Sequence, residues 1–250
     1  MPETASHYTE GERRLHALVR TLLSPGVWMV LAAQIALVFL FQWSAPAEPA
    51  PLVAALTTFL TAAVLMLFFY LEAGAFHALT LSRDALSAGQ VIRGAVPVFA
   101  RFLWLTLKAG VLLVILLNLV FLLAMLVTGY ELKALTEAFY RFIGPVAGVA
   151  AFIFAYWLPF VFVRREFRLF VSLRAALQVA RARLSRSAFL ALLILAPMLL
   201  AGLLPADLPA PLALAVNAFS GLLGWIAYVY CVETLQELPP AEHVATSPAS

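Results

Sequence analysis

Residues 52–71 read LVAALTTFLTAAVLMLFFYL, a run with no charged side chain. A helix rises about 1.5 Å per residue, so about 20 apolar residues cross the roughly 30 Å hydrocarbon core of a bilayer. The run therefore predicts a transmembrane helix. Five similar stretches occur elsewhere in the chain. The six predicted spans are therefore about 25–43, 52–71, 107–128, 142–163, 187–204 and 212–232.

The composition agrees with a membrane protein and excludes several other classes. Of the 250 residues, 64% are hydrophobic and 12% are charged, and the mean hydropathy is +0.98. A soluble domain is about half apolar and about one quarter charged. A soluble enzyme, a disordered protein and a nucleic-acid-binding module are therefore excluded. The four histidines are scattered and Cys231 is the only cysteine, so we expect no disulfide, metal site or cofactor.

The connections between the predicted spans are of two kinds. Segments 44–51 and 205–211 are short, rich in proline and alanine, and lack Lys and Arg, which predicts tight turns that close helical hairpins. The N-terminal segment, the links 72–106 and 164–186, and Lys108 just after the first link instead account for 14 of the 16 basic residues. Because positive loops stay in the cytoplasm, these segments and both termini are predicted to be cytoplasmic in a bacterial inner membrane.

Two basic segments have the pattern of amphipathic helices. In segment 10–24, Leu15, Leu18, Val19 and Leu22 share one helical face. In segment 166–186 the predicted apolar stripe consists of Phe170, Leu173, Leu177, Ala180 and Leu184. Such helices lie at the headgroup level with their cations toward anionic lipid. The predicted lipid or partner contacts are Arg164, Arg165, Arg168, Arg174, Arg181, Arg183 and Arg186.

These features predict an all-α integral membrane protein with six transmembrane helices arranged as three hairpins. Basic amphipathic interfacial helices lie on its cytoplasmic side. The order of interfacial helix, outward span, turn and inward span occurs three times, although the middle copy is weaker. We expect one membrane domain over residues 1–237 and a disordered tail over 238–250.

Four polar residues are predicted at the cytoplasmic ends of the inward spans: Glu72, Glu166, Glu233 and His77. They would form structural ion pairs or a polar site, and for Glu72 we favour an ion pair with Arg83, Arg93 or Arg174. His77 lies about 140° around a helix from Glu72, which argues against a metal or proton site shared by the two.

Small residues in two spans predict close helix packing. Side chains of this size let helix backbones approach one another inside a membrane. The residues concerned are Gly144, Gly148, Ala151 and Ala155 in the fourth span and Gly221 and Gly224 in the sixth.

One part of the chain resembles a known family. The segment WLPFVFV at 157–163, then Glu166, the run SLRAAL at 172–177 and Arg181 are similar to the membrane domain that precedes some bacterial glycerophosphodiester phosphodiesterases. Related stand-alone six-span proteins of unknown function share this order of motifs. The resemblance covers mainly residues 142–204. It implies a six-span fold and an association with membrane organisation or lipid-linked processes. The catalytic barrel has no counterpart here, so no hydrolase activity is implied.

These observations are compatible with three functions. The leading hypothesis is a non-enzymatic inner-membrane protein, either an accessory or assembly subunit or a lipid-contacting scaffold. Its partners would be membrane lipids, mainly anionic, and another membrane protein or complex, with no nucleic acid. The alternative is a permease-like transporter or transporter subunit. The least favoured is an intramembrane lipid-modifying enzyme that uses Glu72, Glu166, Glu233 or His77 as acid or base.

Overall fold

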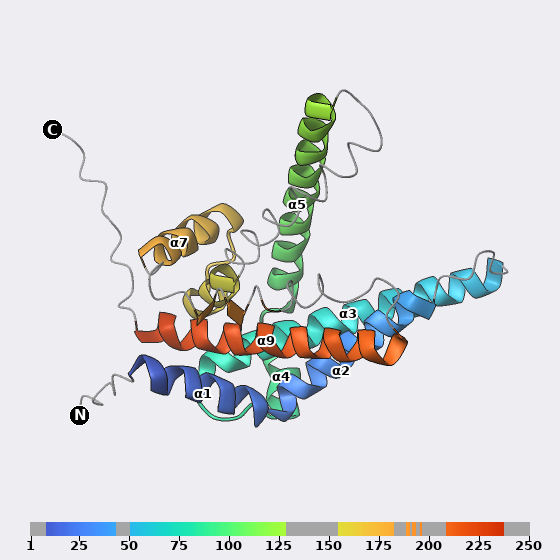
Figure 1. Ribbon diagram of the computed structural model, residues 1–250. Coiled ribbons are helices and arrows are strands. Elements are labelled where there is room, and N and C mark those ends of the chain that lie inside the picture. Colours follow the sequence, from blue (N-terminus) through green and yellow to red (C-terminus); the bar gives the residue numbers. More distant parts are fainter. Residues whose placement is uncertain are drawn as a thin grey trace.

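The structure is a computed structural model that describes residues 9–43, 51–128, 155–182, 189–190, 192–193, 196 and 209–237. This described part contains helices and no strands (Figure 1). The helices are α1 (Glu10–Leu22), α2 (Pro25–Trp43), α3 (Pro51–Leu81), α4 (Ala88–Ala95), α5 (Phe99–Thr128), α7 (Leu169–Ala182) and α9 (Ala210–Glu237). Residues 155–164 are also helical.

In the part of the chain that the structure describes, three helices are long and apolar enough to cross a membrane. Their apolar stretches are Leu52–Leu81, Phe99–Leu123 and Pro211–Glu237. Helices α1 and α2 meet at an angle of 65° at the break before Pro25. If the two together form one bent span, the number of candidate spans in the described residues is four. The described residues therefore confirm the prediction of a helical protein with helices that can cross a membrane. Residues 142–154 and most of 187–204, which belong to the predicted fourth and fifth spans, lie outside the described residues.

The long link predicted between the second and third spans is wrong in its extent. Helix α3 continues to Leu81, α5 already begins at Phe99, and α4 lies between them. Only residues 82–87 and 96–98 are not helical in this region. The predicted spans ended at the first polar residues. A helix can continue past such residues, because it depends on backbone hydrogen bonds and on packing and does not need an unbroken apolar sequence. Here the polar residues pack against other helices.

The predicted interfacial helix 166–186 begins later in the structure, at Leu169. The preceding helix ends in a Schellman motif, because the Glu166 N–H donates to the Val161 carbonyl at 3.0 Å. Arg165, with φ 53°, occupies the left-handed position of this motif. Residues 166–168 therefore lie outside any helix. By contrast, α1 begins at Glu10 as predicted, with a capping box between Thr9 and Glu12.

The hydrophobic core lies at one end of the long helices. It gathers the C-terminal part of α3, the N-terminal part of α2 and residues Trp225–Val232 of α9, together with α1, α4 and residues 156–162. The opposite parts of the same helices are exposed, and Leu56 and Phe59 of α3 have exposed fractions of 61% and 75%. Because α3 has 31 residues, it is about 46 Å long, more than the roughly 30 Å of hydrocarbon. The molecule is thus divided into a packed end and apolar arms.

Helix α4 crosses α3 at a close backbone contact between two glycines. A Cβ atom on Gly74 would lie 2.0 Å from the Val91 carbonyl oxygen, and one on Gly94 would lie 2.9 Å from the Gly74 carbonyl oxygen. Only glycine permits this approach. The contact brings α4 onto the packed end, where Val91 is fully buried. Helix α5 then leads away from the layer formed by α2, α3 and α9 (Figure 1).

Candidate functional site

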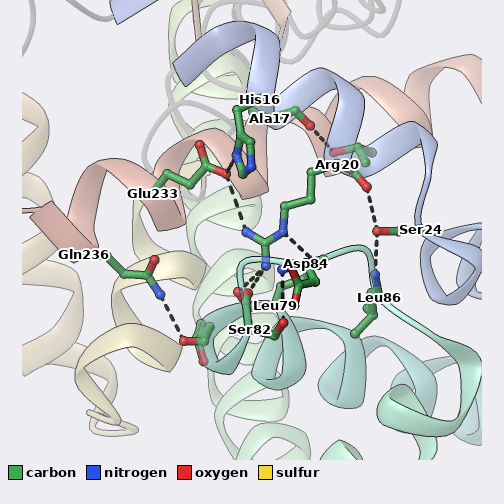
Figure 2. A network of polar contacts seen from close by, with 12 residues as sticks. His16, Ala17, Arg20, Ser24, Leu79, Ser82, Asp84, Leu86, Glu233 and Gln236 are labelled. Atoms are coloured by element: carbon green, nitrogen blue, oxygen red, sulfur yellow. Dashed lines mark hydrogen bonds and ion pairs between the residues drawn. The ribbon is translucent and has the colours of Figure 1, made fainter. Parts of the chain in front are cut away.

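A buried polar network at the packed end is centred on Arg20 of α1 (Figure 2). The guanidinium, with a side chain only 1% exposed, donates to the carbonyl oxygens of Leu79 at 2.9 Å and Asp84 at 3.3 Å, and also to that of Ser82. It forms an ion pair with Glu233 of α9 at 3.5 Å. Arg20 thereby satisfies the last carbonyls of α3 and joins three segments of the chain. Its role is structural.

Further ion pairs link α1 to α9. His16 Nδ1 lies 2.7 Å from Glu233 Oε1, and Arg13 binds both Glu10 and Glu237. The polar face of α1 therefore packs inside the protein. The predicted apolar face of Leu15, Leu18, Val19 and Leu22 is instead exposed, with exposed fractions of 38% to 62%. An outward apolar face is what a helix lying against acyl chains requires.

Glu72 lines a pocket of about 370 Å³ between α2, α3, α9 and residues 155–158. No described residue forms an ion pair or hydrogen bond with its carboxyl group. The expected pairing with Arg83, Arg93 or Arg174 is therefore wrong. The physical reason is the extension of α3, which keeps Glu72 inside a helix rather than at the start of a basic loop.

Of the other three polar residues, Glu233 and His77 are held by the packed end. Glu233 belongs to the Arg20 network, and His77 donates from Nδ1 to the Gly94 carbonyl at 3.0 Å. Glu166 lies outside this end and binds Arg168 through two hydrogen bonds of 2.9 and 2.8 Å. The Arg168 guanidinium holds the pKa of Glu166 below its usual value through these bonds. The four residues thus do not form one site, and the described residues contain no group of three or more metal-ligating side chains.

The seven predicted arginine contacts have different surroundings. Arg165, Arg174 and Arg181 are exposed and have no hydrogen-bond or ion-pair partner among the described residues. Arg168 is also exposed, but Glu166 neutralises its charge. Arg164 is half-buried and donates to the Leu235 carbonyl at 3.4 Å. Arg183 and Arg186 lie outside the described residues.

Helix α7 faces the protein with a stripe different from the predicted one. Its buried residues are Leu169, Ser172, Ala176 and Ala180, whereas Phe170 is 72% exposed. The hydrogen bond that sequence reasoning missed explains this rotation, because the buried Trp157 indole N–H donates to Ser172 Oγ at 2.8 Å. Trp157 and Ser172 are 15 residues apart, on either side of a helix end, so no local pattern in the sequence predicts this hydrogen bond.

An apolar groove of about 590 Å³ runs between α5 and the start of α7. Its α5 wall includes Trp104, Val111 and Ile115, and its other wall is formed by residues 167–171. Lys108 lines the groove with its ammonium 4.9 Å above the Trp104 ring. The groove combines an apolar surface with a cation, which suits an amphiphile with an acyl chain and a negative headgroup.

The structure describes three of the six small residues that were predicted to allow close helix packing. A Cβ atom on Gly221 would lie 2.7 Å from Leu31 Cδ2 of α2, so α9 and α2 are close there. Nothing lies within 4 Å of such an atom on Gly224. Ala155 lines the pocket around Glu72. Gly144, Gly148 and Ala151 lie outside the described residues.

Comparison of the chain with models of protein families, with curated proteins and with solved structures gives no match. The function is therefore argued from the chain's own residues.

Proposed function

We propose that this chain is a non-enzymatic, multi-pass protein of a bacterial inner membrane that binds anionic phospholipid and acts as a lipid-contacting scaffold or accessory subunit. It crosses the membrane six times as three hairpins and has both termini in the cytoplasm. The positive-inside distribution of arginine and the three long apolar helices support this topology.

The observation that carries the proposal is a set of exposed arginines at and near α7, the helix whose first residues form one wall of the apolar groove. Arg174 and Arg181 are seven residues apart on α7, so they lie on one helical face. Arg165 precedes this helix, and none of the three guanidinium groups has a partner among the described residues. Arginine forms paired hydrogen bonds with phosphate oxygens. The groove between α5 and α7 would accept the acyl chain of the same lipid.

The arrangement at α1 supports a position at the membrane surface. Its leucines point outward while its arginines bind carboxylates and carbonyls of the packed end. The packed end is thus stabilised by internal ion pairs, which leaves the arginines at and near α7 for external anions. Each basic group near an anionic surface contributes about 1 kcal/mol to binding.

Native mass spectrometry of the full chain with phosphatidylglycerol tests the proposal. We expect the triple variant R165Q/R174Q/R181Q to bind this lipid at least about 10-fold more weakly, because three phosphate-binding groups of about 1 kcal/mol each are lost. Phosphatidylcholine, which has no net charge, measures the background.

R83Q is the matched control. Like the three arginines, Arg83 is exposed and has no partner among the described residues, but it belongs to the segment between α3 and α4 and does not line the groove. We therefore expect little change in phosphatidylglycerol binding. Equal losses in R83Q and the triple variant, or no loss in either, would contradict the proposed site.

A further inference from the structure

The pocket around Glu72 is chemically different from the arginine surface. Among the described residues that line it, Glu72 is the one with a charge, and its carboxyl group has no ion-pair or hydrogen-bond partner in the same part of the chain. The second polar side chain is the amide of Gln34 on α2. A carboxylate inside a protein is costly unless it is paired. A positively charged ligand would supply the missing partner.

Three aromatic rings form one wall of the same pocket. The ring centroid of Phe76 lies 5.0 Å from that of Trp225 and 4.4 Å from that of Tyr228. The Tyr228 hydroxyl donates to the Phe76 carbonyl at 3.0 Å, which fixes the ring in place. All three residues line the pocket and are less than 7% exposed. Aromatic faces attract cations, and clusters of them bind ammonium groups.

We infer that this pocket binds an ammonium group, with the Glu72 carboxylate as its counter-ion and Phe76, Trp225 and Tyr228 as its aromatic wall. Gln34 would accept one hydrogen bond from the ammonium through its amide oxygen. The inference does not depend on the anionic-lipid site, which uses other residues and the opposite charge.

The position of the pocket relates it to the lipid headgroups. Glu72 follows the exposed arm of α3, which contains Leu56 and Phe59, and lies at the start of the buried segment Leu71–Leu79. The pocket therefore lies at the junction of the apolar arms and the packed end. An amine at this depth has two sources: the headgroup of a lipid such as phosphatidylethanolamine, or a small soluble amine.

Two measurements on the full chain in detergent separate these sources. Native mass spectrometry measures retained phosphatidylethanolamine, and calorimetry measures binding of butylamine against 1-butanol, which has the same chain with a hydroxyl group in place of the ammonium. We expect E72Q to weaken binding of the amine about 10-fold or more, because the ammonium loses its counter-ion and the charged hydrogen bond to it. E166Q, which removes an acid outside the pocket, is the matched control.

Loss of phosphatidylethanolamine in E72Q, with phosphatidylglycerol retained, supports a lipid amine. Butylamine binding that depends on Glu72, without retained phosphatidylethanolamine, supports a soluble amine. If E72Q does not fold, the wild-type comparison decides, because butylamine must bind more tightly than 1-butanol. Equal binding of butylamine and 1-butanol, or amine binding that is the same in E72Q and wild type, overturns the inference. Phosphatidylglycerol binding reports separately on the proposed function.

Discussion

At the scale of single residues, the structure divides the charged side chains into those that hold the fold and those that face outward. Arg20 and Arg13 are buried and bound on α1, whereas Arg174 and Arg181 are exposed and unpaired among the described residues. A buried guanidinium is stable only when its hydrogen bonds are satisfied. The same residue type therefore has opposite roles at the two positions.

We expect R20M to lower the free energy of unfolding by about 3–5 kcal/mol, since it removes a buried charge that pairs with Glu233, which keeps only His16, and leaves three carbonyls without their donor. Chemical unfolding of the detergent-solubilised protein measures this. The control R83M removes an exposed arginine without a partner in the described part of the chain and should change the value by less than about 0.5 kcal/mol. Equal effects of the two variants would show that the network is not stabilising.

At the scale of elements, the contact between α3 and α4 shows why these two helices need glycine. Gly74 and Gly94 place the two backbones against each other, and α4 is capped at its start by Ser87 and Gln90. The cap fixes where this short helix begins, and the glycine contact fixes where it lies. Without the contact, an eight-residue helix is too short to be stable alone.

We expect G74A to destabilise the protein by about 3 kcal/mol, because the new Cβ atom would overlap the Val91 carbonyl and force α4 away from α3. The control is G110A on α5, where no atom lies within 4 Å of the added Cβ. This variant should gain about 0.5–1 kcal/mol from helix propensity. The same unfolding titration measures both, and a harmless G74A would show that the two backbones are farther apart.

At the scale of the whole molecule, the chain separates into a packed end and exposed apolar arms. The 18-residue apolar window of α3 has no buried residue, while the following segment from Leu71 to Leu79 belongs to the core. Exposed apolar surface of this extent is stable in lipid rather than in water. The arms therefore belong in the bilayer, and in the topology that we propose the packed end lies on its cytoplasmic side.

Cysteine labelling with a membrane-impermeant maleimide tests this orientation. In intact spheroplasts we expect labelling of A47C, T136C and A206C, and labelling of A85C only after permeabilisation. Ala85 is exposed in the segment between α3 and α4, and the native Cys231 is fully buried, so the background is low. Labelling of A85C from outside, or of any of the other three only from inside, would refute the proposed topology.

The sequence alone determined that the chain is helical and belongs in a membrane, because hydrophobic length and charge are local properties. It also predicted helices over 10–24 and 25–43 with nearly their observed bounds, since the spacing of Leu15, Leu18, Val19 and Leu22 and the position of Pro25 are local signals. It did not predict that α3 and α5 extend past their apolar stretches. The extension of α3 is stabilised by packing against α4 and α9 and by Arg20 of α1, and the extension of α5 by packing against α3.

Only the tertiary structure decided which polar residues meet. Glu233 binds residues of α1 more than 200 positions away, and Glu72 meets aromatic rings of α9 rather than a nearby arginine. Ser172 turns α7 toward Trp157 and sets which arginines face outward. Periodicity can place a residue on one face of a helix. Which other helix that face contacts depends on tertiary packing. The packing energy comes from many contacts between segments that are distant in the sequence, so it cannot be derived from any one of them.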